Sequence, residues 1–370
     1  MRITFVAPGY SRHPSGGFRM IYQYANQLAA HGHHVAVVHP RQFPHAPRPA
    51  TVSVREMARN AYGALRDIVS KPLIDWQPID DRVKLSFVDD GSDRELPVGD
   101  AIFATGWCTV EPVLRCGASK GEKFYLIQGY EAYQATKELV EATWHAPLHK
   151  AVVSKWLLNL GKEMGCKDLT YLPNALDHEK FRVIEPIEGR GRRVAMLFHP
   201  APLKGAADGI AAIEGAKKRF PDLEGVFFGI SRRKSWIPDW IEYYQNPAQE
   251  VLVKEIYNRA SVFVGPSWSE GFGLTPAEAA ACGCAVAATE NGGHREYVQH
   301  AVTGLLSPIK DPQALCENLC ALLGDEELRV KMARACGRVL EEFNWKRSTD
   351  LLEEFIASRI ERRSSVEVTG

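Results

Sequence analysis

Residues 261–283, "SVFVGPSWSEGFGLTPAEAAACG", decide the fold and raise the question of function. The run "SVFVG" has the length and the β-branched composition of a buried strand. Thr275, Pro276 and Glu278 then match a capping box, with Thr at the N-cap, Pro at the first helical position and Glu at the third. The stretch therefore predicts a strand, a turn and a helix that begins at Pro276.

Glu270 lies in that turn, where helix capping does not explain it. Gly271 and Gly273 let successive backbone N–H groups point the same way, which makes a nest for an anion. The positive end of the following helix adds to the attraction. Because a carboxylate accepts hydrogen bonds from a diol, Glu270 beside such a nest indicates a ligand with a phosphate and a sugar or ribose.

The alternation of strand and helix continues along the chain and predicts two series. The first series has strands at 3–8, 34–40, 101–105, 123–128, 150–154 and 169–173, with a helix at 18–31 that Gly32 closes as a left-handed cap. Residues 173–193 have the composition of a linker. The second series has strands at 194–200, 225–231, 261–267 and 285–289, and helices at 206–219, near 249–259 and from 276.

Two such series predict an α/β fold with two doubly wound, Rossmann-like domains facing a cleft. The domains are expected at 1–173 and 174–345. Residues 310–360 have a helical pattern with a break at 343–345, and residues 346–370 are expected to form a C-terminal helix that packs back on the first domain. Residues 41–100 are irregular, and the pattern assigns them no role.

Composition excludes several classes of protein. The 370 residues include 45 basic and 45 acidic side chains, so no general charge draws the chain to nucleic acid. The eight cysteines form no C-x-x-C pair, which is typical of a reducing cytoplasm. The apolar run at the N-terminus is too short for a signal peptide or a membrane span. We therefore expect a cytoplasmic protein, with peripheral membrane contact left open.

The segment "EGFGLTPAE" (270–278) resembles the Glu-x7-Glu signature of the retaining GT-B glycosyltransferases of family 4, glycosyltransferase group 1. "APGYSRHPSGG" (7–17) is similar to the glycine-rich first loop of that family. "LPNALD" (172–177) resembles its entry to the second domain, and "PLKG" (202–205) resembles its donor-phosphate lysine motif. The resemblance implies a first, acceptor-binding domain and a second domain that binds a nucleoside-diphosphate sugar.

The resemblance also implies roles for residues of the second domain. Lys204 would bind the donor diphosphate, and Glu270 would contact hydroxyls of the transferred sugar, so these two are the catalytic candidates. Glu278 would bind the ribose, or serve only as a helix cap. The family usually has Arg where this chain has His199, which carries full charge only at acid pH. The backbone that would hold the sugar and phosphates, and the residue expected near the nucleobase, are Gly271, Phe272, Gly273, Leu274 and Tyr244.

The first domain holds the acceptor-side candidates. Gly16 and Gly17 would approach the diphosphate or the acceptor, or form only a flexible loop. Family members often have a His after the strand at 123–128, but this chain has Gln128-Gly129-Tyr130-Glu131 there, so no catalytic His carries over. Gln128 would bond a sugar hydroxyl, and Trp107 would stack on a ligand or pack in the core. The implied reaction moves a hexose to an acceptor hydroxyl with no metal or other cofactor.

Four rival functions follow from the same pattern. A nicotinamide dehydrogenase needs G-x-G-x-x-G in the first loop, which is absent. A metal-dependent transferase could use the acids of "VDDGSD" (88–93), which also fit a polar turn. A non-catalytic nucleotide-sugar-binding protein and a GT-B sugar phosphorylase share the expected fold. The sequence does not identify the sugar, the nucleobase, the acceptor, the pathway or the oligomeric state.

Overall fold

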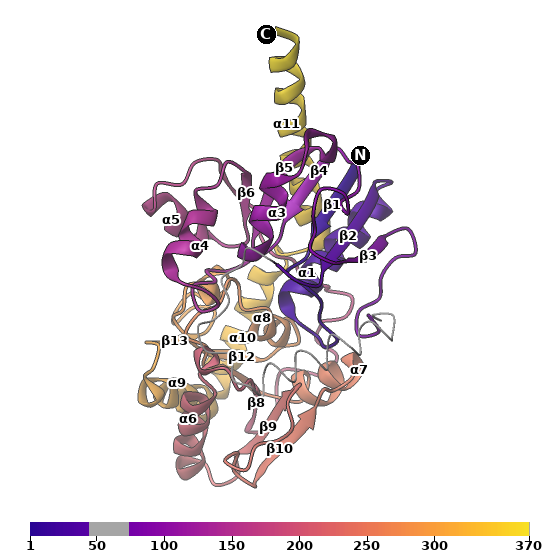
Figure 1. The fold of residues 1–370 in the computed structure, drawn as a ribbon. Helices are drawn as coiled ribbons and strands as arrows, with labels where there is room; N and C mark the ends of the chain where they lie inside the picture. Colours follow the sequence, from indigo (N-terminus) through magenta and orange to yellow (C-terminus); the bar gives the residue numbers. More distant parts are fainter. Residues whose placement is uncertain (44–73, 370) are drawn as a thin grey trace. The chain divides into compact units, whose positions relative to one another are not determined.

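The computed structural model describes residues 1–43 and 74–369. Part of the irregular stretch at 41–100 therefore lies outside the described residues. The chain divides into two compact units (Figure 1). Unit 1 contains Met1–Val153, Leu158–Leu172 and Thr349–Gly370, and unit 2 contains Ser154–Leu157 and Pro173–Ser348.

Unit 1 is built on a parallel sheet with the strand order β3-β2-β1-β4-β5-β6-β7. The order runs outward from β1 in both directions, which is the doubly wound arrangement. Its strands are β1 (Arg2–Val6), β2 (His34–Pro40), β3 (Lys84–Val88), β4 (Ala101–Ala104), β5 (Glu122–Ile127), β6 (His149–Val152) and β7 (Leu169–Tyr171). The intervening helices are α1 (Gly16–Ala30), η1 (Trp107–Thr109), α3 (Val110–Arg115), η2 (Ala118–Lys120), α4 (Lys137–Trp144) and α5 (Lys155–Glu163).

Unit 2 has a second parallel sheet, with the order β10-β9-β8-β11-β12-β13. Its strands are β8 (Arg193–Leu197), β9 (Glu224–Gly229), β10 (Ile241–Gln245), β11 (Val262–Gly265), β12 (Ala285–Thr289) and β13 (Leu305–Ser307). Its helices are η3 (Pro202–Lys204), α6 (Ala206–Arg219), α7 (Gln249–Val251), η4 (Leu252–Tyr257), α8 (Leu274–Ala281), η5 (Gly293–Glu296), α9 (Pro312–Gly324) and α10 (Glu326–Leu340). The last helix, α11 (Trp345–Thr369), begins in unit 2 and continues in unit 1.

The central strands β11 and β12 of unit 2 are buried at every position, which explains their nearly continuous apolar sequences. In β11, Val262 and Val264 belong to one core cluster, which also contains apolar residues of α6 and α9. Phe263, between them, points to the other face and packs with residues of η4 and α8. Because successive residues of a strand face opposite sides, a strand covered by helices on both sides must be apolar at every position.

These observations confirm the predicted fold class of two parallel, Rossmann-like α/β domains. The sequence pattern missed three strands at the edges of the sheets, namely β3, β10 and β13. The helix expected near 249–259 is instead a short α-helical turn, α7, followed by the π-helical segment η4. Among the described residues, none of the helices combines the length and the apolar composition that crossing a membrane requires.

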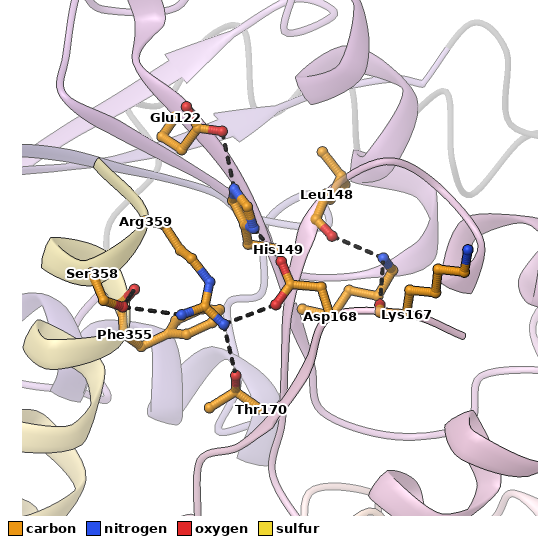
Figure 2. A network of polar contacts seen from close by, with 10 residues as sticks. Glu122, Leu148, His149, Lys167, Asp168, Thr170, Phe355, Ser358 and Arg359 are labelled. Carbon is orange, nitrogen blue, oxygen red and sulfur yellow. Dashed lines mark hydrogen bonds and ion pairs between the residues drawn. The ribbon is translucent and has the colours of Figure 1, made fainter. Parts of the chain in front are cut away.

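Polar contacts fasten α11 to the sheet of unit 1 (Figure 2). Arg359 donates to Asp168 across 2.8 Å, and its guanidinium lies 5.0 Å from the centre of the Phe355 ring. His149 joins Asp168 on one side and Glu122, 3.1 Å away, on the other. Burial raises the pKa of Asp168, but the contacts with Arg359 and His149 outweigh burial, so the pKa lies below its ordinary value. The carboxylate of Asp168 therefore stays ionised between two potential cations.

We expect Arg359→Ala to lower the free energy of unfolding of unit 1 by about 1–2 kcal/mol, the scale of a partly exposed, charge-assisted hydrogen bond. Urea unfolding of the full chain measures this change. Glu361→Ala is the matched control, because Glu361 lies on the same helix and is exposed. Equal unfolding midpoints for the two variants would show that Arg359 does not anchor the helix.

Candidate functional site

The loop that follows β11 ends at Gly273, which caps the amino end of the next helix, α8. Gly273 has φ 86° and ψ 61°, is the N-cap of α8, and leaves Leu274 as the first helical residue. The predicted capping box is therefore wrong, because α8 begins before Pro276 and its N-cap has no side-chain hydrogen bond. A left-handed glycine made the earlier start possible. Glu278 consequently lies within the helix and needs another explanation.

Gly273 is also confined by the side chains around it. A Cβ atom at this position would lie 2.6 Å from His294 and 2.9 Å from the Tyr297 hydroxyl. That hydroxyl donates to the Gly273 carbonyl across 2.8 Å. A Cβ atom on Gly293, in the turn after β12, would lie 2.7 Å from the Glu270 carbonyl oxygen. The loop 270–273 is thus held in shape by backbone-to-backbone and side-chain contacts that leave no room for larger residues.

Lys204 and Glu270 form an ion pair. The Lys204 ammonium donates to Glu270 Oε1 across 2.7 Å, and the two side chains are 28% and 19% exposed. Burial raises the pKa of the Glu270 carboxyl, but the charge and hydrogen bond of Lys204 outweigh burial, so the pKa lies below its ordinary value. Glu270 is therefore ionised at neutral pH and partly accessible to a ligand.

The loop after β8 brings Lys204 to this position. Gly205 has φ 62°, and a Cβ atom there would lie only 2.0 Å from the Pro266 carbonyl oxygen, so the close approach requires glycine. The Trp268 backbone N–H donates to the Leu203 carbonyl across 2.7 Å. The Trp268 indole donates to Asp208, on α6, at the same distance. These contacts fix the loops after β8 and β11 against each other.

His199 follows β8 and stands where the resemblance implies an arginine. The Ala201 N–H donates to His199 Nδ1 across 3.1 Å, so the neutral ring carries its proton on Nε2. Burial lowers the pKa of His199, and the charge of Lys204 lowers it further, against the opposing effect of Glu270. The ring is therefore neutral at pH 7 and offers a ligand one N–H group rather than a positive charge.

Glu278 lies on α8 and is buried, with only 3% of its surface exposed. It accepts a hydrogen bond from the Tyr257 hydroxyl across 3.3 Å. Tyr244, the expected neighbour of the nucleobase, lies on β10, which β9 and β8 separate from β11. Its side chain packs partly against the core cluster that contains Tyr257. The structure therefore brings Lys204, His199 and Glu270 together and leaves Tyr244 at the edge of the sheet.

The sequence pattern did not identify two residues, Trp156 and His294, that support the loop 270–273. The Trp156 indole donates to the Gly271 carbonyl across 2.9 Å and packs on Gly292. His294 donates from Nδ1 to the Thr289 carbonyl across 2.9 Å, while its buried Nε2 atom has no hydrogen-bond partner among the described residues. The Gly-Gly-His turn at 292–294 is a signal that could have indicated His294. No sequence signal indicates Trp156, because it lies 115 residues from its partner Gly271.

In unit 1, the acceptor-side candidates follow β4 and β5 or open α1. A Cβ atom on Gly17 would lie 3.6 Å from the Gln128 amide nitrogen, so these two are neighbours, with Gly16 beside them as the first residue of α1. The Tyr130 hydroxyl donates to Glu141 across 2.8 Å. The Trp107 indole donates to Gln134 across 3.3 Å. The side-chain polar groups of Tyr130 and Trp107 therefore already have protein partners.

Glu131 is a further carboxylate near this edge that the sequence pattern did not single out. It accepts a hydrogen bond from the Trp107 backbone N–H across 2.8 Å. Burial raises its pKa to about 7, although the Trp107 N–H opposes that rise.

A separate cavity of about 440 Å³ in unit 1 is lined by residues 145–150, 165, 167 and 168 and contains none of the predicted site residues.

The acids at 88–93 form a polar turn. Glu95 accepts the backbone N–H groups of Asp89, Asp90 and Gly91 at 2.9–3.1 Å, and Asp90 accepts that of Ser92. The segment therefore uses its carboxylates to satisfy its own backbone.

The candidate site in unit 2 differs, because the Lys204–Glu270 ion pair, the N-terminus of α8 and two constrained glycines, Gly205 and Gly273, converge there. Such a set can bind an anion beside a group that bears hydroxyls.

We expect Gly273→Ala to lower the free energy of unfolding by about 2–4 kcal/mol. A left-handed non-glycine residue costs about 1–3 kcal/mol, and the clash with His294 adds an overpacking penalty of similar size. Chemical denaturation measures the loss. Gly191→Ala is the control in the same unit, because a Cβ atom there meets nothing within 4 Å. Equal stability of both variants would mean that the loop relaxes without cost.

The loop 270–273 lies in a part of the chain that matches a known protein family. Residues 177–338 match the model of the family described as glycosyl transferases group 1. The D-inositol 3-phosphate glycosyltransferase of Thermobispora bispora is 34% identical over 116 residues, or 31% of this chain and 27% of that protein. The enzyme of the same name from Geodermatophilus obscurus is 39% identical over 106 residues, or 29% and 23%. The matches thus span about a quarter of the length of these curated relatives.

Solved structures resemble the chain over nearly its whole length. Sucrose-phosphate synthase from Thermosynechococcus elongatus has a TM-score of 0.70 at 18% identity, with 98% of this chain and 99% of that chain covered. HepE of Anabaena, solved with UDP and glucose, has a TM-score of 0.69 at 14% identity, with 97% and 100% covered. The fold is therefore the GT-B fold of these neighbours. Together, the findings show a match to the glycosyl transferases group 1 model over residues 177–338 and a shared fold over nearly the whole chain.

Proposed function

We propose that the chain is a retaining glycosyltransferase of family 4, which moves a hexose from a nucleoside-diphosphate sugar to an acceptor hydroxyl without a metal. The observation that carries the proposal is the Lys204–Glu270 pair at the N-terminus of α8. A cation, backbone amides and a helix dipole suit a diphosphate, and an ionised carboxylate beside them suits sugar hydroxyls. HepE of Anabaena, a neighbour in fold, has been solved with UDP-glucose, which supports this class of donor.

The proposed donor contacts follow from the chemistry of each group. Lys204 and the amides of 271–274 bind the diphosphate, and His199 adds one N–H donor. Glu270 accepts hydrogen bonds from hydroxyls of the transferred sugar. Glu278 accepts hydrogen bonds from the ribose, which requires its buried carboxylate to exchange its contact with Tyr257 for the ligand.

In the proposed step, the acceptor oxygen forms a bond to the anomeric carbon while the bond from that carbon to the diphosphate breaks. The leaving diphosphate takes up the electron pair of the broken bond. Its charge is stabilised by Lys204 and by the amino end of α8, which point at the place where charge develops. The proton of the acceptor hydroxyl passes to an oxygen of the leaving phosphate on the same face. No protein nucleophile is required.

The acceptor is assigned to unit 1, where Gly17 and Gln128 are neighbours and Trp107 follows β4. Small molecules, glycans and lipid-linked acceptors are the acceptor classes that fit a hydroxyl nucleophile. The eight cysteines are free thiols. This supports a reducing, cytoplasmic compartment, the expected place for nucleotide-sugar donors.

A ligand screen tests the proposal. Nucleoside diphosphates and their sugars are each added to the purified full chain in EDTA, and the unfolding temperature is measured. We expect the diphosphate and the diphosphate sugars of one nucleoside to raise this temperature. A ligand that binds only the folded state stabilises that state by mass action. Transfer from the matching sugar donor should then continue in EDTA. A screen without any stabilising nucleotide would overturn the proposal.

Of the variants Lys204→Met and Glu270→Gln, only Lys204→Met should weaken nucleoside-diphosphate binding. Lys204→Met removes a charged hydrogen bond and should weaken binding by about 1.5–3 kcal/mol, or about 10- to 150-fold. Glu270→Gln removes a negative charge that repels the diphosphate and competes for Lys204. It should keep or increase the affinity while slowing sugar transfer at least about tenfold.

Calorimetry measures the affinity, and product formation measures the transfer. Lys218→Met is the control for loss of a positive charge, since Lys218 is an exposed residue of α6. Equal weakening of diphosphate binding by Lys204→Met and Glu270→Gln would contradict the separate roles. It would indicate that Glu270 acts only by positioning Lys204.

A further inference from the structure

We propose that His31, Asp350 and Glu353 form a binding site for a zinc ion in unit 1. One ligand atom from each of these residues lies within 4.8 Å of the other two. His31 follows the last residue of α1, whereas Asp350 and Glu353 belong to α11, more than 300 residues further along the chain. Tertiary folding therefore brings an imidazole and two carboxylates to one point.

The geometry is close to that of a metal site. His31 Nδ1 lies 2.9 Å from Glu353 Oε2. Zinc bonds of about 2.0–2.2 Å at tetrahedral angles place ligand atoms about 3.4 Å apart. The hydrogen-bonded pair would therefore open by about half an ångström, and the other pairs, all within 4.8 Å, would close by at most about 1.4 Å. Asp350 and Glu353 share one face of the helix because they are three residues apart, so both can turn to the same ion.

His33 supports the proposed ligand from outside the site. Its Nε2 atom lies 2.6 Å from Glu353 Oε1, the oxygen that does not face His31. The His33 side chain is only 14% exposed. Metal-binding carboxylates commonly have such a hydrogen-bonding partner, which fixes the orientation of the ligand oxygen. His33 is thus a positioning residue, and Glu353 is oriented before an ion arrives.

Charge and donor type indicate which ion fits. Two carboxylates and a neutral imidazole balance the charge of a divalent cation. An imidazole nitrogen favours zinc and similar transition metals, whereas magnesium and calcium prefer oxygen donors alone. The three protein ligands leave a fourth position for water. Both His31 and Asp350 are exposed, so an ion can reach the site from solvent.

The position in the fold indicates a structural ion. The turn with His31 precedes β2 and therefore lies at the amino edge of the parallel sheet, whereas the acceptor-side candidates follow the carboxyl ends of β4 and β5. The ion would join the α1–β2 turn to α11. The proposal does not depend on the reaction assigned above, and it concerns a site separate from the transfer step.

The test is a calorimetric titration of ZnCl₂ into the untagged full chain after EDTA has been removed by dialysis. We expect one zinc ion per chain in the wild type. His31→Ala, Asp350→Asn and Glu353→Gln should each weaken binding at least tenfold, because each removes a ligand. His33→Ala should weaken it about 10- to 100-fold through the lost orientation of Glu353. Zinc should also raise the unfolding temperature of the wild type but not of the ligand variants.

Matched substitutions of neighbouring residues separate a built site from general zinc binding by surface groups and thiols. His34→Ala and Glu354→Gln change exposed residues next to His33 and Glu353 and should leave zinc affinity unchanged. Asp350 is exposed, so Asp350→Asn keeps the test valid if another ligand variant fails to fold. The proposal is overturned if the wild type shows no saturable binding, or if the ligand variants bind zinc as tightly as the neighbouring variants do.

Discussion

The close approach of two loops in unit 2 is the constraint on which the candidate site depends. The chain after β8 passes so near the chain after β11 that Gly205 has no space for a Cβ atom beside Pro266. That approach places Lys204 within hydrogen-bonding distance of Glu270. A second glycine, Gly273, takes a left-handed conformation and starts α8 directly after the loop. Backbone geometry therefore arranges the charged groups.

The ion pair means that charges are already in place before a ligand binds. Glu270 neutralises much of the field of Lys204, so a diphosphate gains less from this lysine than from a free one. In return, both side chains are held in position, and little conformational entropy remains to be lost. His199 is neutral and adds a hydrogen bond without adding charge. Affinity for an anion must then come largely from the amides and the helix terminus.

The first unit depends on a different kind of long-range contact. Helix α11 comes from the end of the chain, and polar side chains tie it to the rest of unit 1 at two places. Glu353 bonds His31 and His33, and Arg359 bonds Asp168. Figure 2 shows the second of these networks, in which Arg359 reaches Asp168 from the helix. The C-terminal segment is therefore an integral part of the first unit, although it is the part of the chain most distant in sequence.

The sequence by itself determined the α/β class, most strands and helices, and the local chemistry of the loop at 270–274. Strand length, apolar runs and glycine turns are local properties, so they can be read from neighbouring residues. Only the tertiary structure decided that α8 starts at Leu274 with Gly273 as its N-cap, and that Glu278 is no helix cap. It also decided that Trp156 supports the loop and that His31 meets Glu353. Each of these depends on packing between segments far apart in the chain, and no local periodicity encodes such contacts.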